Sequence, residues 1–237
     1  MPATADTSDP TKNRLLAALP REEYELIVPN LGPTSFKLGE VVYESGGKME
    51  HIYFPTTSIV SLLYVMENGA SAEMGMAGNE GLVGVALFMG GNSMPNRAVV
   101  QNAGGAVRMK AQVMRNEFAR GGAFQSLLLR YTQALITQMS QTAVCNRLHA
   151  IEQQLCRWLL LIHDRMDSDE LVMTQELIAN MMGVRREGVT AAAGRLQEQG
   201  LISYVRGRIQ ILDRRGLEAA VCECYKVVKD EYDRLLG

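Results

Sequence analysis

The chain has 237 residues and a formal net charge of −2. This length allows one large domain or two modest ones, and we expect two. Because general polyanion binders are usually strongly basic, the near-neutral charge argues against such a protein and requires any nucleic-acid surface to be local.

The N-terminal residues 1–10 have no basic start and no apolar core of signal-peptide length, so we expect a disordered polar tail and no secretion. The most apolar helical run, residues 155–162, contains Arg157 and is far shorter than the ~20 residues of a membrane span. These features predict a soluble, cytoplasmic protein with reduced cysteines and no membrane partner.

Residues 11–122 are expected to form one domain. Two short helical patterns, separated by Pro20, predict a helical cap over residues 11–31. From residue 34 to about 110, short apolar runs alternate with Gly, Pro and Asn turn signals, which is typical of a β-sandwich or β-roll. Residues 59–66 end near Asn68-Gly69, a pair that tolerates the positive φ of a tight hairpin.

The run from residue 123 to 166 lacks Gly and Pro, which predicts helix with one break near His149. We expect the central helix over residues 123–150. An apolar stripe follows it at spacings of three and four, made by Phe124, Leu128, Tyr131, Leu135 and Met139. Periodicity alone leaves two interpretations open: a helix packed on its own domain, or a dimer seam of coiled-coil type.

Residues 174–212 predict a helix-turn-helix followed by a wing. Thr174 can cap a helix that ends at Gly183, and residues 185–187 open a second helix that ends near Gly200. Two strands then follow, with a turn at residues 206–208. Residues 171–215 contain seven Arg, no Lys and four acidic side chains, so the local charge is +3.

A helix that enters the major groove presents its first residues to base edges, where Arg donates to guanine and Glu accepts from cytosine. We therefore expect Arg186, Glu187 and Thr190 to read bases. Phosphate contacts fix register without reading sequence. For these contacts we expect Thr174, Gln175, Arg185, Arg206 and Arg208.

Catalytic and metal chemistry are not expected. The three histidines have no neighbouring arrangement typical of an activated nucleophile, and no Gly-rich phosphate loop opens a helix, so the chain is not expected to be an enzyme. Cys222 and Cys224 could form half of a metal site, but no second pair stands at ligand spacing. A helix through both residues would also point the two thiols in different directions, so no metal site is expected.

The chain resembles the Crp/Fnr family, named after the cyclic-AMP receptor protein and the fumarate-nitrate reductase regulator. The resemblance is carried by residues 36–40, 52–54, 84–88, 173–179, 182–190 and 195–202. It implies an α+β fold with an N-terminal β-roll of the cyclic-nucleotide-binding, jelly-roll type and flanking helices. A long central dimerisation helix and a C-terminal winged helix-turn-helix over residues 151–237 complete the implied fold.

This resemblance implies a homodimeric, sequence-specific transcription regulator that reads an inverted repeat in double-stranded DNA, with RNA polymerase as a further partner. It also favours the dimer interpretation of the apolar stripe. The family's recognition helix commonly opens Ser-Arg-Glu-Thr-Val, with another Arg shortly after. Arg186 and Glu187 match, but Ala191 stands at the later Arg position, so the operator is expected to differ. The alternative function is a ligand-binding regulatory subunit that acts on a protein partner.

Family members that bind cyclic nucleotides use a Gly-Glu pair and an Arg followed by Ser or Thr. Here Gly84 precedes Val85 and Arg97 precedes Ala98, and each missing ligand group costs ~1–3 kcal/mol if buried. Control by cyclic AMP is therefore not expected, although Gly84 and Arg97 form a candidate pocket for another effector. No cofactor is expected: the first cysteine is Cys145, which argues against an iron–sulfur sensor.

Overall fold

The computed structural model describes residues 9–237, so nearly all of the expected polar tail lies outside the described residues. The chain divides into two compact units. The N-terminal unit contains the described residues up to 62, residues 75–136 and residues 232–237, and the C-terminal unit contains residues 63–74 and 137–231. Within residues 9–237, no helix combines the length and the apolar character needed to cross a membrane.

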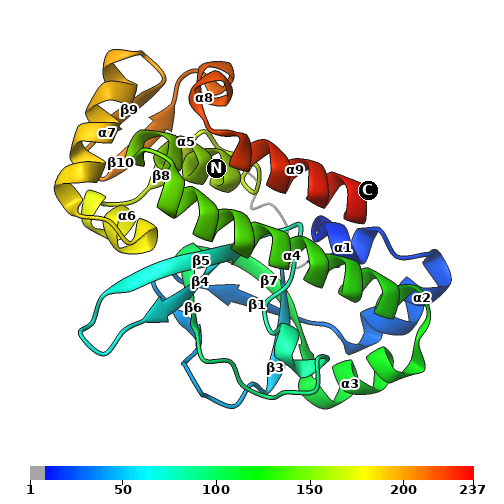
Figure 1. The fold of residues 1–237 in the computed structure, drawn as a ribbon. Helices are drawn as coiled ribbons and strands as arrows, with labels where there is room; N and C mark the ends of the chain where they lie inside the picture. Colours follow the sequence, from blue (N-terminus) through cyan, green and yellow to red (C-terminus); the bar gives the residue numbers. More distant parts are fainter. Residues whose placement is uncertain (1–8) are drawn as a thin grey trace, which may run out of the picture. The chain divides into compact units, whose positions relative to one another are not determined.

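The N-terminal unit is built on two sheets, as the resemblance predicted (Figure 1). The first sheet has the order β1-β7-β3, with bounds Gly32–Phe36, Gly104–Lys110 and His51–Pro55. The second has the order β2-β6-β4-β5, with bounds Val41–Tyr43, Arg97–Asn102, Ile59–Val65 and Ser71–Ala77, and residues 63–65 of β4 and 71–74 of β5 are counted with the C-terminal unit. In the first sheet the strands pair antiparallel, with Gly32 opposite Arg108 and Pro55 opposite Ala106.

Short helices cover the start of this unit, as the two helical patterns predicted. They are η1 (Pro10–Lys12), α1 (Arg14–Ala17), α2 (Arg21–Ile27) and η2 (Val28–Asn30), and the unit also holds η3 (Val85–Leu87) and α3 (Ala111–Arg120). Buried Asn13 fixes α1 because its Oδ1 accepts from the backbone N–H of Leu16. Its Nδ2 donates to the backbone oxygens of Pro55 and Gly81, at 2.9 and 2.8 Å, so one amide satisfies three backbone groups.

Helix α4 runs from Gly122 to Leu148 and α5 from Ile151 to His163, which confirms the break near His149. The apolar stripe, however, faces the chain's own core. Phe124, Leu128, Tyr131 and Leu135 are buried and Met139 is half-buried. The Tyr131 hydroxyl donates to the backbone oxygen of Leu82 at 2.9 Å. The assignment of this stripe to a dimer seam is therefore wrong, because these side chains already pack within one chain.

The C-terminal unit carries α6 (Gln175–Met182), α7 (Arg186–Glu198), α8 (Arg214–Ala220) and α9 (Glu223–Leu236), although α9 runs on into the N-terminal unit. Its sheet has the order β8-β10-β9, with bounds Glu170–Val172, Arg208–Ile211 and Ile202–Val205. Strand β8 was not predicted, because three residues are too few to show an alternating pattern. It pairs antiparallel with β10, with Ile209 opposite Leu171.

Candidate DNA-binding interface

The turn between α6 and α7 has the predicted local structure. The Thr174 hydroxyl accepts from the backbone N–H of Leu177 at 3.2 Å and caps α6. Gly183 ends the helix with φ +66°, a conformation that is unfavourable for side chains with a Cβ. Helix α7 then begins at Arg186.

Helix α7 has one buried and one exposed face. Val189, Ala192, Ala193 and Leu196 are buried, whereas Arg186, Glu187, Thr190 and Ala191 are exposed. All three predicted base readers thus lie on the exposed face. Thr190 already has two neighbours, since its hydroxyl lies 2.7 Å from Gln175 Oε1 and 3.0 Å from the backbone oxygen of Arg186. To donate to a base, the Thr190 hydroxyl would have to turn away from these two acceptors, whereas it can accept from a base without doing so.

A cleft of about 450 Å³ lies between the starts of α6 and α7 and the tip of the wing. Its lining comprises Thr174, Gln175, Glu176, Arg186, Tyr204, Arg206 and Gly207. The cleft brings one predicted base reader, Arg186, together with three predicted phosphate contacts. Arg185 and Arg208 do not line it within the described part of the chain.

The wing is a tight hairpin of β9 and β10. Val205 pairs with Arg208, so the turn consists of Arg206 and Gly207, both at positive φ. This matches the two-residue turns that fit the twist of antiparallel strands. The backbone oxygen of Gly207 accepts from the N–H of Met173 at 2.7 Å, which ties the turn to the residue before the α6 cap. Arg206 is therefore held at the tip of a fixed loop.

Tyr204 is a residue of the cleft that the sequence analysis missed. Its hydroxyl donates to the backbone oxygen of Met173 at 2.7 Å, and its backbone N–H donates to Gln197 Oε1. Burial raises the pKa of Tyr204 to about 12, against the opposing charge of Arg186, so the hydroxyl keeps its proton at neutral pH. An aromatic residue within a short strand was the available signal, but a strand pattern does not reveal a bond to a distant backbone.

The arginines of this surface divide into two groups. Arg195 pairs with Glu152, Arg208 with Glu170, and Arg214 with Asp164 and Glu218. Arg185, Arg186 and Arg206 make no ion pair within residues 9–237. Their charge is therefore available to a polyanion without first breaking an internal ion pair.

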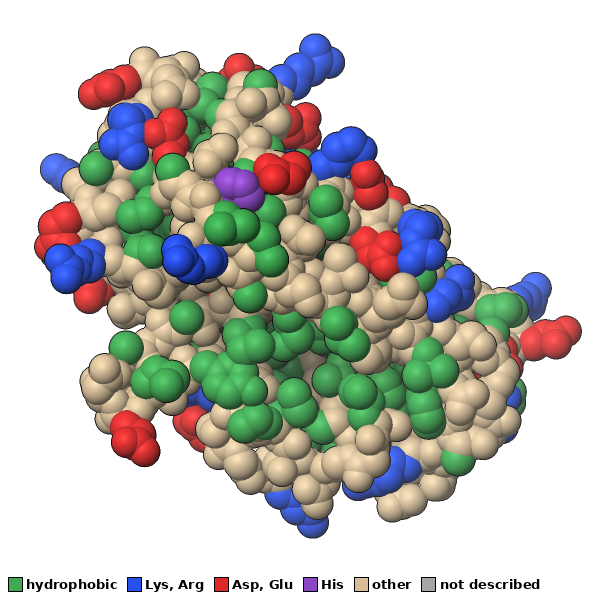
Figure 2. Space-filling model, viewed as in Figure 1, with side chains coloured by type: hydrophobic (Ala, Val, Ile, Leu, Met, Phe, Trp, Pro, Cys, Tyr) green, Lys and Arg blue, Asp and Glu red, His purple; other side chains and the backbone are tan. Residues whose placement is uncertain are grey.

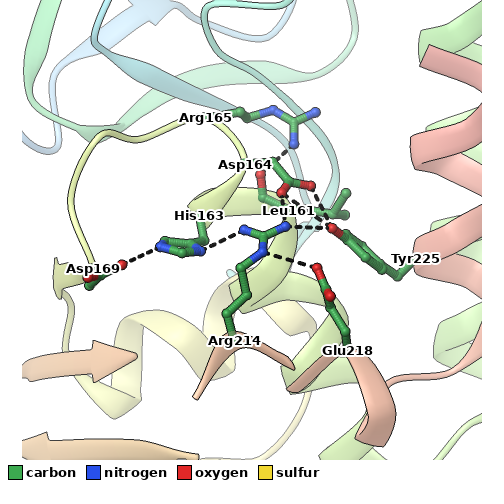
Figure 3. A network of polar contacts seen from close by, with 8 residues as sticks. All are labelled: Leu161, His163, Asp164, Arg165, Asp169, Arg214, Glu218 and Tyr225. Atoms are coloured by element: carbon green, nitrogen blue, oxygen red, sulfur yellow. Dashed lines mark hydrogen bonds and ion pairs between the residues drawn. The ribbon is translucent and has the colours of Figure 1, made fainter. Parts of the chain in front are cut away.

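A polar network holds the end of α5 to β8, α8 and α9 (Figure 3). The Arg214 guanidinium donates to His163 Nδ1 at 2.7 Å and to the Tyr225 hydroxyl at 2.9 Å, and it pairs with Asp164. Because His163 accepts at Nδ1, its other nitrogen can donate to Asp169 Oδ1 at 2.7 Å. The network fixes the elements on which the wing is built.

Two family models match separate parts of the chain. A model of the Crp-like helix-turn-helix domain matches residues 153–220, and a model of the cyclic nucleotide-binding domain matches residues 33–120. The chain belongs to the Crp/Fnr family. It is a Crp-like transcription regulator with a helix-turn-helix DNA-binding domain and a cyclic nucleotide-binding domain.

Solved Crp/Fnr structures share the fold. A Crp/Fnr transcriptional regulator from Eubacterium rectale has a TM-score of 0.68, with 87% of this chain and 96% of that chain covered. FixK2 from Bradyrhizobium japonicum has a TM-score of 0.67, with 81% and 98% covered. A CRP-family regulator from Thermus thermophilus has a TM-score of 0.66, with 79% and 95% covered. Each is 17% identical in sequence, and no curated relative matches.

The N-terminal unit of this chain contains a cleft of about 340 Å³ beside β2 and β3. Its lining residues include Glu44, Lys48, His51 and Arg108. Within the described residues, neither Gly84 nor Arg97 lines this cleft. Arg97 instead pairs with Glu44 at 3.1 Å and so contacts one of the lining residues. Gly84 lies before η3, where an added Cβ would stand 3.5 Å from the Ile52 Cα.

Four groups suited to a soft metal ion also meet in the C-terminal unit: Cys145, His149, Cys222 and Cys224. The sequence argument against Cys222 and Cys224 assumed a helix through both residues. That assumption is wrong, because α9 begins at Glu223 and Cys222 precedes it. The two thiols can therefore point toward the same place.

Proposed function

We propose that the protein acts in the cytoplasm as a homodimer that binds an inverted-repeat operator in double-stranded DNA. The observation that carries the proposal is the start of α7, where exposed Arg186 and Glu187 lie beside the cleft formed with the wing. A two-fold dimer would present two such surfaces to one duplex, which is why an inverted repeat is expected. RNA polymerase is a further partner by family resemblance.

The dimer seam is proposed on the face of α4 opposite the buried stripe. Leu129 and Ile136 stand seven residues apart and are 51% and 55% exposed. Figure 2 shows hydrophobic side chains gathered in the lower half of the drawn face, where Figure 1 places the roll and the first half of α4. Apolar side chains two turns apart along one helix are typical of a helix-to-helix contact.

We expect cyclic AMP to have no effect on DNA binding. Val85 and Ala98 stand where a carboxylate and a hydroxyl would be needed, and the Arg97 guanidinium is already paired with Glu44. Leaving ligand groups unpaired in a buried site is costly. Arg97 and Gly84 remain candidate contacts for another effector.

Selection of bound duplexes from genomic fragments, followed by salt titration on the preferred site, tests the function. We expect an inverted repeat, and an affinity that falls steeply with salt because phosphate contacts release counterions. Bound sequences without two-fold symmetry would refute the proposal that a homodimer binds an inverted repeat. If no duplex is bound at any salt concentration, the alternative function, a ligand-binding regulatory subunit that acts on a protein partner, would be favoured.

A further inference from the structure

The ends of two helices in the C-terminal unit meet in a cluster of three thiols and one imidazole. Cys145 lies in the last turn of α4 and His149 directly follows that helix. Cys222 and Cys224 flank the first residue of α9. The Sγ atoms of Cys145 and Cys222 are 3.6 Å apart, as are the Cys224 Sγ and the His149 Nδ1. We call these four residues the thiol–imidazole cluster.

We propose that the thiol–imidazole cluster is a structural zinc site. Its four ligand atoms lie within 4.8 Å of one another. A tetrahedral zinc ion with Zn–S bonds of about 2.3 Å holds its sulfur ligands about 3.8 Å apart, close to the spacing in the cluster. Three cysteines and one histidine are a common ligand set for structural zinc, with no open position for substrate.

The geometry disfavours other metal groups. Iron–sulfur clusters place irons and sulfides between their ligand sulfurs and therefore need wider spacing across the set. Calcium and magnesium require oxygen ligands, and the cluster offers sulfur and nitrogen. A single soft cation is the group that fits.

Burial distinguishes the cluster from a chance meeting of cysteines on a surface. All three cysteines are buried, and Val221 packs against them. Buried free cysteines alone would be unremarkable, because the thiol packs as a small apolar group. The imidazole makes a metal site the better interpretation, because its Nδ1 lies 3.6 Å from the Cys224 Sγ.

The second nitrogen of His149 is also positioned. Its Nε2 lies 3.4 Å from the Glu223 carboxylate, whose side chain is 76% exposed. Metal-binding histidines commonly donate their other N–H to a carboxylate, which sets the ring orientation and the tautomer. The backbone holds the residue as well, because the His149 N–H donates to the Cys145 oxygen and Gln154 Nε2 donates to the His149 oxygen.

The charge around the cluster is compatible with bound zinc. Three thiolates and one divalent cation leave a net charge of about −1. The buried Arg157 acts electrostatically on Cys145 and Cys224, and it also donates a hydrogen bond of 3.2 Å to the Thr142 hydroxyl. A positive side chain beside the cluster would offset that charge. Zinc would thus join the end of α4 to the start of α9.

Metal content and cobalt substitution of the full-length protein test the site. We expect about one zinc ion per chain after purification without chelators. Removal of zinc and titration with Co²⁺ should produce the visible absorption of tetrahedral cobalt and a thiolate charge-transfer band, and Zn²⁺ should abolish both. Iron with acid-labile sulfide in place of zinc would overturn the proposal. A Cys145–Cys222 disulfide in the purified protein would also overturn it if the reduced protein then bound no metal.

Matched variants separate this site from general damage to the fold. Cys224→Ser should lose stoichiometric binding, whereas Cys156→Ser, which removes a buried thiol outside the cluster, should retain it. Because Glu223 is exposed, the Glu223→Gln variant should fold normally. It should bind Co²⁺ about 10- to 100-fold more weakly, with unchanged stoichiometry. Equal binding by wild type, Cys224→Ser and Glu223→Gln would refute the site.

Discussion

At the scale of single residues, the pairing of each arginine determines what it can contribute to DNA binding. Arg186 is exposed at the start of α7 and makes no ion pair in the described chain, so its guanidinium is free to donate two hydrogen bonds to a guanine. We expect Arg186→Ala to cost about 1–3 kcal/mol on the preferred operator and to relax the choice of base at one position in each half-site. Binding to a panel of single-base operator variants measures both effects.

Arg195 provides the control on the same helix, because it lies toward the other end of α7 and already pairs with Glu152. Arg195→Ala should leave base preference unchanged. If Arg186→Ala retained the full pattern of base preferences, Arg186 would not be a reader.

Arg206 is expected to act differently because it occupies the turn of the wing, on the other side of the cleft from Arg186 at the start of α7. As a phosphate-binding side chain it should affect all duplexes alike, so that Arg206→Ala weakens binding whatever the sequence. We expect this substitution to make the log–log salt dependence shallower by about one unit for each phosphate that is no longer neutralised. Fluorescence anisotropy over a range of salt concentrations measures this slope.

Arg208 is the second phosphate-binding residue expected in the wing, but it lies in β10 and pairs with Glu170. It must exchange this partner to reach a phosphate, so Arg208→Ala should change the slope less than Arg206→Ala. A larger change in slope for Arg208→Ala than for Arg206→Ala would show that the ion pair with Glu170 does not prevent Arg208 from contacting a phosphate.

At the scale of helices, the two glycines at positions 183 and 194 should respond oppositely to alanine. An added Cβ at Gly183 would lie 3.1 Å from the Ala72 Cβ, and φ there is +66°. At Gly194, within α7, an added Cβ meets nothing within 4 Å. We expect Gly183→Ala to lower the free energy of unfolding by about 1 kcal/mol or more, and Gly194→Ala to raise it by about 0.5–1 kcal/mol.

Chemical unfolding measures the free energy of unfolding of both variants. Because the substitution is glycine to alanine in each case, any difference between them reflects the position. A stabilising Gly183→Ala would mean that the turn between α6 and α7 is not held in the left-handed conformation.

The sequence predicted those features of the elements that local signals determine. The Thr174 cap, the stop at Gly183 and the break near His149 each follow from residue types adjacent in the chain. Periodicity identified the stripe through Tyr131 but could not say what covers it, because a helix has the same pattern whether it packs on its own domain or on a second chain. The meeting of Cys145 with Cys222 joins residues 77 positions apart, and no local spacing encodes it.

At the scale of the whole molecule, the proposed dimer depends on the exposed face of α4. Ile136→Glu should place a charge in the seam, and the two-fold symmetry repeats the change. Ile136 is 55% exposed in one chain, so loss of its burial in both copies costs about 1.5–3 kcal/mol per dimer, and the dissociation constant should rise by about 10- to 10²-fold or more. Sedimentation velocity over a range of concentrations measures this shift. Leu26→Glu, at a similarly exposed position on α2, should leave the dimer intact.

DNA binding should report the same change, because a dimer binds its second half-site as an intramolecular event. If the operator is an inverted repeat with half-site centres one helical turn, ~34 Å, apart, the wild type should lose affinity when base pairs are inserted between the half-sites. Ile136→Glu should bind intact and lengthened operators with the same low affinity, because a monomer contacts one half-site at a time. A variant that is monomeric yet still sensitive to the inserted base pairs would show that the two copies contact each other on DNA through a different surface.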